Sequence, residues 1–175
     1  MTLDLIEEKL GEAHGLAIAA SSLTGTVARH VDDWTLRAVL DDLRRDADET
    51  RRRCLALERS LGSDPAGELL AHANTTAQHV GDLVAAWFKA GTDEFRAWCF
   101  LVMGEAGELA AWKALAELTH ADDGALAELA RWGERLQARH LELALEGVPR
   151  LAQRAGFANP GTGDVEGRSK SRRKD

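Results

Sequence analysis

The stretch that decides the fold is "GEAGELAAWKALAEL", residues 104–118, whose apolar side chains recur at three- and four-residue steps. This spacing is typical of one face of an α-helix, and the same stripe continues upstream through Phe95, Trp98 and Val102. Glu105 and Glu108 fall on this stripe rather than on a polar face. Because a helix buries its apolar stripe, the sequence predicts two carboxylates inside a helical core.

The composition indicates a single all-α domain. The chain has 175 residues, of which 45% are hydrophobic and 29% charged, as in an ordinary soluble protein. It has only 3 prolines and no tyrosine, while Ala, Leu, Glu and Arg recur throughout, which favours helix over strand. Cys54 and Cys99 are isolated, so we expect buried thiols in a reducing compartment rather than nucleophiles.

Charge and hydropathy exclude several classes of partner. The net charge of −7 opposes binding to nucleic acid and to anionic membranes. The start of the chain has acidic residues where a signal peptide has basic ones, and no run reaches the roughly 18 apolar residues of a membrane span. We therefore expect a cytoplasmic protein with neither a membrane nor a nucleic acid as its partner.

Five amphipathic segments predict five helices. They cover about residues 2–29, 34–61 and 65–90, then run from Thr92 or Asp93 to a turn near residue 121, and from Asp122 or Asp123 to a fading end near Gly147 and Pro149. Short turns near residues 32 and 121 make two antiparallel hairpins, which the third helix joins as a crossover. The expected fold is a ferritin-like four-helix bundle over residues 1–150, with this additional helix and a disordered basic tail over residues 151–175.

Counting from the helix starts predicts a cluster of carboxylates at mid-bundle. Glu49 and Glu108 lie at similar distances from the starts of two parallel helices, and Glu134 mirrors Glu108 about the turn near residue 121. Three carboxylates are thus expected at one height.

A second layer is expected about one helical turn away, containing Asp46 and Glu105. His140 is the histidine placed closest to this layer. Buried carboxylates must be protonated, paired with cations or bound to a metal. The alternatives are therefore a metal centre and a metal-free remnant neutralised by arginines such as Arg53.

Two motifs carry a resemblance to a known family. "ADETRRRCLALERSLG", residues 47–62, and "GEAGELAAWKAL", residues 104–115, resemble the second- and fourth-helix motifs of the ferritin-like metal-binding proteins of the YciE/YciF type. The resemblance implies acidic ligand positions at Glu49, Glu105, Glu108 and Glu134. It implies a stress-associated protein that binds iron or manganese through carboxylates, which bridge hard cations, and imidazole.

The chain also departs from that family. Asp46 stands where a histidine is expected, Trp112 stands where a tyrosine is usual, and the first helix lacks its glutamate. The sequence thus leaves two functions open, a protein that binds iron or manganese through a degraded ligand set and a metal-free bundle that acts in interactions or assembly. Long helices with exposed faces further predict a homodimer.

Overall fold

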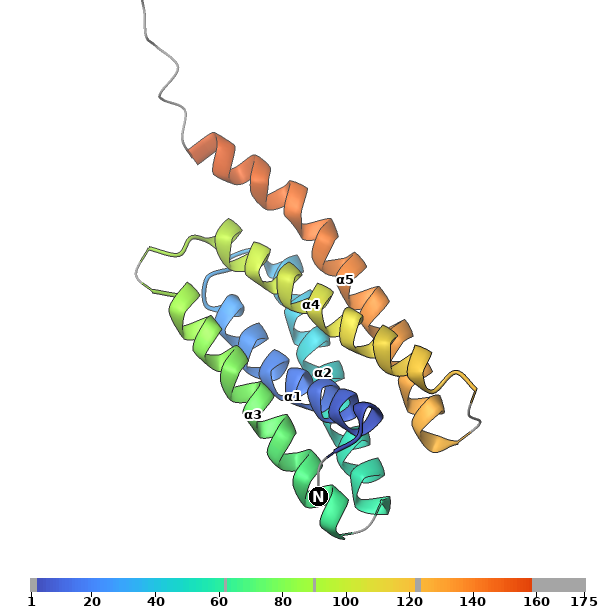
Figure 1. Ribbon diagram of the computed structural model, residues 1–175. Coiled ribbons are helices and arrows are strands. Elements are labelled where there is room, and N and C mark those ends of the chain that lie inside the picture. The colour runs from blue at the N-terminus through green and yellow to red at the C-terminus, as the bar shows by residue number, and fades with distance from the viewer. Residues whose placement is uncertain (1–2, 62, 90, 122–123, 159–175) are drawn as a thin grey trace, which may run out of the picture.

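A computed structural model describes residues 3–61, 63–89, 91–121 and 124–158, and these residues form helices without any strand (Figure 1). The prediction of an all-α fold is therefore confirmed over the described chain. Five helices follow one another: α1 (Leu5–Ala28), α2 (Trp34–Ser60), α3 (Ser63–Trp87), α4 (Glu94–Leu118) and α5 (Ala125–Ala158).

Three helices begin at an aspartate that caps their free backbone N–H groups. Asp4 and Glu7 form a reciprocal capping box at the start of α1. The carboxylate of Asp33 accepts hydrogen bonds from the first turn of α2, and that of Asp93 accepts one from Arg96 in α4. The predicted caps Asp122 and Asp123 lie outside the described residues.

Helices α1, α2, α4 and α5 surround the interior, and α3 lies outside them. In sequence around the ring, α1 packs on α2, α2 on α5, α5 on α4 and α4 on α1, whereas α3 packs along α1 and α2 (Figure 1). The starts of α2 and α4 lie at the same end, because the carboxylate of Glu94 accepts a hydrogen bond from the N–H of Asp32 at 3.1 Å. Heights along α2 and α4 can therefore be compared by counting from their starts.

Helix α5 does not fade near Gly147 and Pro149, as the sequence predicted, but continues to Ala158 with Pro149 inside it. Two arginines of its last turns hold it against the start of α2: Arg150 and Arg154 lie 2.6 Å and 2.7 Å from the same oxygen of Asp33. Leu151 is also buried. These contacts compensate for the backbone donor that proline lacks.

The predicted tail over residues 151–175 is thus helical in its first part, to Ala158. Residues 159–175 lie outside the described residues. Among the described helices, none is both long and apolar enough to cross a membrane.

Two tryptophans of α4 fix the register of α4 against α5. A Cβ at Gly147 would overlap the indole of Trp98, and a Cβ at Gly133 would overlap that of Trp112. The Nε1–H of Trp98 also donates a hydrogen bond to the carbonyl of Ala144 at 2.7 Å. Each indole therefore lies in a notch that only glycine leaves open.

Candidate functional site

The interior between these two tryptophans holds a buried acidic cluster. Glu105 and Glu108, one turn apart on α4, have exposed fractions of only 3% and 4%. Both residues lie on the apolar stripe of α4, between Trp98 and Trp112, which pack against α5. The sequence prediction that both carboxylates are buried is confirmed.

His140 of α5 lies opposite Glu105 and connects it to α2. The distance from His140 Nδ1 to Glu105 Oε2 is 3.6 Å, and His140 Nε2 lies 3.0 Å from Asp46 Oδ2. The imidazole is 2% exposed, so it is held inside the bundle between two carboxylates. The expected neighbourhood of Asp46, Glu105 and His140 is thus present.

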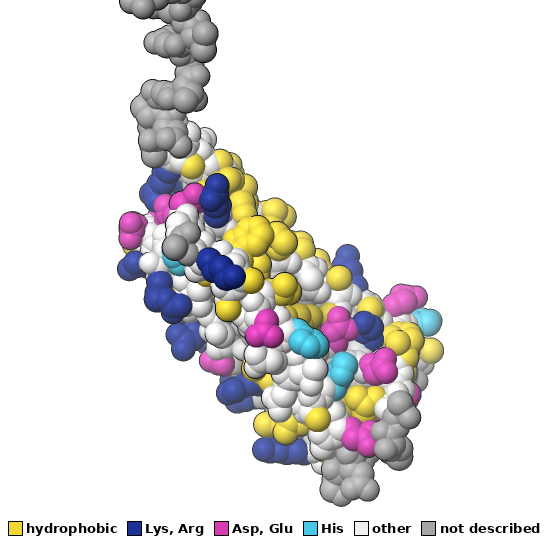
Figure 2. Space-filling model, turned by 60° about the vertical axis from the view of Figure 1, so that its left-hand side comes forward, with side chains coloured by type: hydrophobic (Ala, Val, Ile, Leu, Met, Phe, Trp, Pro, Cys, Tyr) yellow, Lys and Arg dark blue, Asp and Glu magenta, His cyan; other side chains and the backbone are white. Residues whose placement is uncertain are grey.

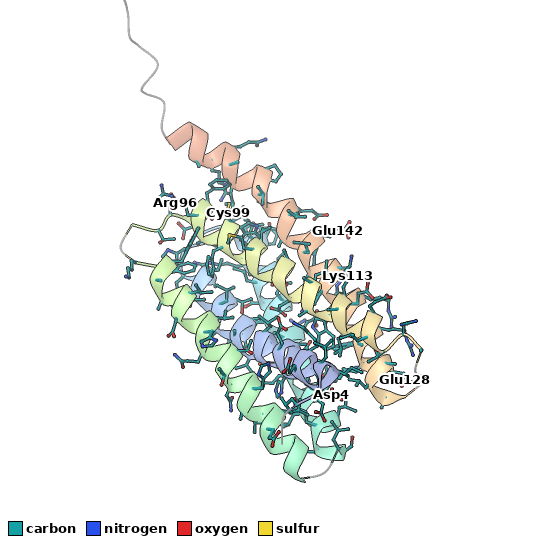
Figure 3. All side chains as sticks on the ribbon, viewed as in Figure 1. Asp4, Arg96, Cys99, Lys113, Glu128 and Glu142 are labelled. Atoms are coloured by element: carbon teal, nitrogen blue, oxygen red, sulfur yellow. The ribbon has the colours of Figure 1, made fainter. Side chains whose placement is uncertain are left out.

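Asp46 connects this interior to the surface. Its side chain is one quarter exposed, and its Oδ2 atom also accepts a hydrogen bond from Arg139 Nη2 at 2.6 Å. Arg139 itself is largely exposed. In contrast, side chains on the outer faces, such as Glu142 of α5 and Arg96 of α4, point away from the bundle (Figure 3).

Glu108 contacts an amide instead of a base. Gln137 Nε2 donates a hydrogen bond to Glu108 Oε2 at 2.9 Å. Burial, and then the nearby charge of Glu105, raise the pKa of Glu108 well above its usual range. A carboxyl group in this environment retains its proton where an exposed glutamate has lost it.

The imidazole of His140 is shifted in the same direction. Burial alone opposes its charged form, but the carboxylates of Glu105 and Asp46 outweigh burial and raise the pKa of His140. Both shifts therefore favour the protonated forms, of the imidazole at His140 and of the carboxyl group at Glu108.

The structure places Glu49 and Glu134 away from this cluster. Glu49 pairs with Arg52 and with Arg53, whose side chain also lies 4.1 Å over the ring of Trp132. These arginines lower the pKa of Glu49, chiefly through the hydrogen bond from Arg53, so its carboxylate is ionised and paired.

Glu134 lines a surface pocket of about 570 Å³ between α4 and α5. The same pocket includes Glu117 and His120, which form a Glu-x-x-His sequence at the end of α4. His120 Nδ1 lies 2.7 Å from the carbonyl of Glu117, and two cationic side chains, Lys113 and Arg131, share the pocket. The positive charges make this a poor cation site despite the motif.

The register explains why Gln137 faces Glu108 in place of Glu134. Four contacts join α4 to α5: Trp98 with Gly147, Glu105 with His140, Glu108 with Gln137, and Trp112 with Gly133. In each pair, the two residues lie equally far along the sequence from the midpoint between positions 122 and 123. The sequence prediction placed the turn near residue 121. This difference of one and a half residues at the turn moves the partner of Glu108 by three residues along α5.

Sequence reasoning missed a second buried acid–histidine contact. His14 Nδ1 of α1 lies 2.7 Å from Glu58 Oε1 of α2, and both side chains are at most 2% exposed. Cys54, one turn before Glu58, is also buried, and burial raises the pKa of its thiol, followed by the charge of Glu58. The sequence signal that could have revealed this contact is the position of His14 on the apolar stripe of α1, between Leu10 and Ala17.

The described residues contain no group of three or more His, Cys, Asp or Glu side chains whose positions could hold a metal ion. A two-metal centre does not fit, because Glu49 and Glu134 lie elsewhere and only one histidine is present in the cluster.

A single cation fits the chemistry of the remaining donors. Glu105 Oε2 is buried without any hydrogen-bond partner, and its 3.6 Å separation from His140 Nδ1 is too long for a hydrogen bond. The contact of the other imidazole nitrogen with Asp46 matches the carboxylate that commonly orients a metal-binding histidine.

The chain matches no family model, no curated protein and no solved structure. The interpretation of the cluster therefore rests on its geometry and on the sequence motifs.

Proposed function

We propose that this protein is a ferritin-like helical bundle that binds one divalent cation, iron or manganese, between α4 and α5. His140 Nδ1, Glu105 and Glu108 are the proposed ligands, and Asp46 orients the imidazole. The observation that carries the proposal is the buried Glu105 Oε2 atom, which has no hydrogen-bond partner and lies 3.6 Å from an imidazole whose far nitrogen contacts Asp46. In such a position, iron or manganese would supply one-electron redox chemistry.

The charge of the cluster supports this proposal. In the metal-free protein, the raised pKa values favour a protonated His140 beside Glu105 and a protonated, neutral Glu108. Loss of both protons leaves a neutral imidazole and two carboxylates, which one divalent cation balances. The interior can therefore exchange two protons for one cation without any change in net charge.

The arrangement of the helices supports the ferritin-like part of the proposal. Two hairpins, α1–α2 and α4–α5, face one another, and the intervening α3 returns the chain along the bundle. Ferritin-like proteins likewise join two hairpins by a long crossover and place their ligands on inward faces. The YciE/YciF-type motifs extend this proposal to a role in stress responses.

Thermal unfolding with Mn²⁺ or with chelator tests the proposal. A cation that binds only the native state must raise the unfolding temperature, so wild-type protein is expected to melt higher with Mn²⁺. Glu105→Gln is expected to abolish this increase, whereas Glu134→Gln, which removes the same charge outside the cluster, is expected to retain it. Equal melting temperatures of the wild type with Mn²⁺ and with chelator would contradict the proposal.

A second candidate function is that of a metal-free bundle acting in self-association, and a separate observation favours it. Leu83 and Trp87 of α3 and Met103 of α4 are 62%, 43% and 58% exposed, and Trp87 stacks on Phe100 at a centroid distance of 5.0 Å. Figure 2 shows hydrophobic side chains gathered in one patch on this side of the molecule. Such a patch is typical of an interaction site.

A homodimer is the form of self-association that we propose, because most soluble oligomers are symmetric assemblies of one chain. Sedimentation velocity at micromolar concentration is expected to show a dimer that Met103→Glu weakens. A 19.0 kDa species for the wild type would contradict it.

A further inference from the structure

Two consecutive residues of α5 contact one oxygen atom of α2. Arg139 Nη2 and His140 Nε2 lie 2.6 Å and 3.0 Å from the same atom, Asp46 Oδ2. The three side chains are increasingly buried from Arg139, which is 59% exposed, through Asp46 at 25% to His140 at 2%. They form a continuous contact from solvent to the buried cluster.

The shared oxygen links the guanidinium to the properties of the imidazole. A carboxylate that accepts the N–H of a metal-binding histidine makes the imidazole a stronger donor to the metal. A guanidinium on the same oxygen draws charge from that carboxylate, because charge-assisted hydrogen bonds are strong. Arg139 therefore weakens the interaction between the Asp46 carboxylate and the Nε2 atom of His140.

We propose that Arg139 is a positioning residue that weakens cation binding at the Glu105–His140 site by holding Asp46 Oδ2 in competition with His140. This inference rests on the proposed cation site. A surface residue of α5 would thus control the cation affinity of a site that it does not contact. Any anionic group that draws Arg139 away from Asp46 would consequently strengthen cation binding.

The test compares Mn²⁺ affinity, measured by isothermal titration calorimetry at one pH, in matched variants. Arg139→Gln is expected to bind Mn²⁺ about threefold to tenfold more tightly than wild type, within the range of effects of residues beyond the ligands. Arg135→Gln is the control, because Arg135 is exposed on the same helix, one turn away, and forms no ion pair within the described residues. It measures the effect of removing one positive charge without touching Asp46.

A double-mutant cycle separates competition for Asp46 from a general structural effect. In an Asp46→Asn background, Arg139→Gln is expected to change Mn²⁺ affinity no more than Arg135→Gln does, because the shared carboxylate is gone. Arg139→Lys is expected to bind Mn²⁺ with nearly wild-type affinity, because it keeps a cation at Asp46. Far-UV circular dichroism establishes that each variant is folded.

The outcomes distinguish this inference from the site on which it rests. Equal affinities of Arg139→Gln and Arg135→Gln would overturn the role of Arg139 and leave the cation site intact. An Arg139→Gln effect that persists in the Asp46→Asn background would overturn the competition for Asp46. Absence of Mn²⁺ binding in both wild type and Arg139→Gln would overturn the site itself, and with it this inference.

Discussion

The molecule buries two acid–histidine contacts that differ in their charge balance. Between α1 and α2, His14 and Glu58 form an isolated pair with a distance of 2.7 Å, one acid and one base. Between α4, α5 and α2, a single histidine meets Glu105 and Asp46, and Glu108 lies in the same interior. The first contact joins one carboxylate to one imidazole and leaves Glu58 Oε2 without a hydrogen-bond partner, whereas the second has more carboxylates than bases.

This difference explains why one contact is structural and the other is a candidate site. A buried pair of one acid and one base is costly to break, and it leaves no excess carboxylate for a cation to balance. In the second cluster, burial and the charge of Glu105 favour the protonated form of the additional carboxyl group, Glu108. A stored proton can be exchanged for a cation, and Asp46 and Arg139 lead from this cluster to solvent.

The largest expected effect comes from breaking the structural pair. Glu58→Ala leaves His14 buried without its partner and is expected to lower the free energy of unfolding by about 3–5 kcal/mol in urea denaturation. The loss should be the same with Mn²⁺ and with chelator. A loss that Mn²⁺ alters would instead place a cation at His14 and Glu58.

The second effect is a change in the pH dependence of stability. Because the pKa of Glu108 is raised on folding, its contribution is fully present below the unfolded pKa and is lost as pH rises towards the folded pKa. In that window the loss approaches about 1.4 kcal/mol per pH unit.

Glu108→Gln should remove this contribution, so with chelator its advantage over the wild type should grow as pH rises. Urea denaturation between pH 5 and pH 8 measures both proteins. Parallel stability curves over this range would show that Glu108 stores no proton.

The sequence predicted which residues belong to the cluster more accurately than it predicted how they are arranged. The stripe of α4 identified Glu105 and Glu108, and counting from the helix starts placed Asp46 level with Glu105, because parallel helices of similar rise keep their heights. Counting about the α4–α5 turn placed Glu134 level with Glu108 and His140 one turn from Glu105, and both positions were wrong by three residues because the centre of that turn decides the register. The notches at Gly133 and Gly147 set that centre, and no periodicity in one helix reveals them.

The remaining differences also have local physical causes. Glu49 lies one turn from Asp46, but its neighbouring arginines pair with it on the surface of α2. The helix end predicted at Pro149 ignored long-range ion pairs to Asp33, which stabilise the last turns of α5. Ion pairs local in sequence therefore determined the position of Glu49, whereas long-range ion pairs determined the length of α5.

The third effect concerns the orientation of His140. Asp46→Asn removes the carboxylate that holds Nε2 and is expected to weaken Mn²⁺ binding about tenfold to a hundredfold in calorimetric titrations. Asp48→Asn is the matched control on α2, because Asp48 contacts Ser21 of α1 instead of the cluster. Equal affinities of these two variants would exclude Asp46 from the site.

The smallest effect is expected at the predicted ligand that the structure places in the surface pocket. Glu134→Gln should change the free energy of unfolding by no more than about 0.5 kcal/mol, as for other surface substitutions, and should leave Mn²⁺ affinity unchanged. Thermal unfolding with and without Mn²⁺ measures both. Loss of Mn²⁺ binding in this variant would move the site from the interior to that pocket.

The exchange of protons for a cation is the central claim, and calorimetry tests it most directly. Titrating Mn²⁺ into the wild-type protein at pH 7, in two buffers with different ionisation enthalpies, gives the number of protons released per cation. Release of between one and two protons, from His140 and Glu108, is expected for the wild type, and no binding is expected for Glu105→Gln. Binding heats that are identical in the two buffers once the heat of buffer–metal interaction is subtracted, or the absence of any binding heat in both, would contradict this claim.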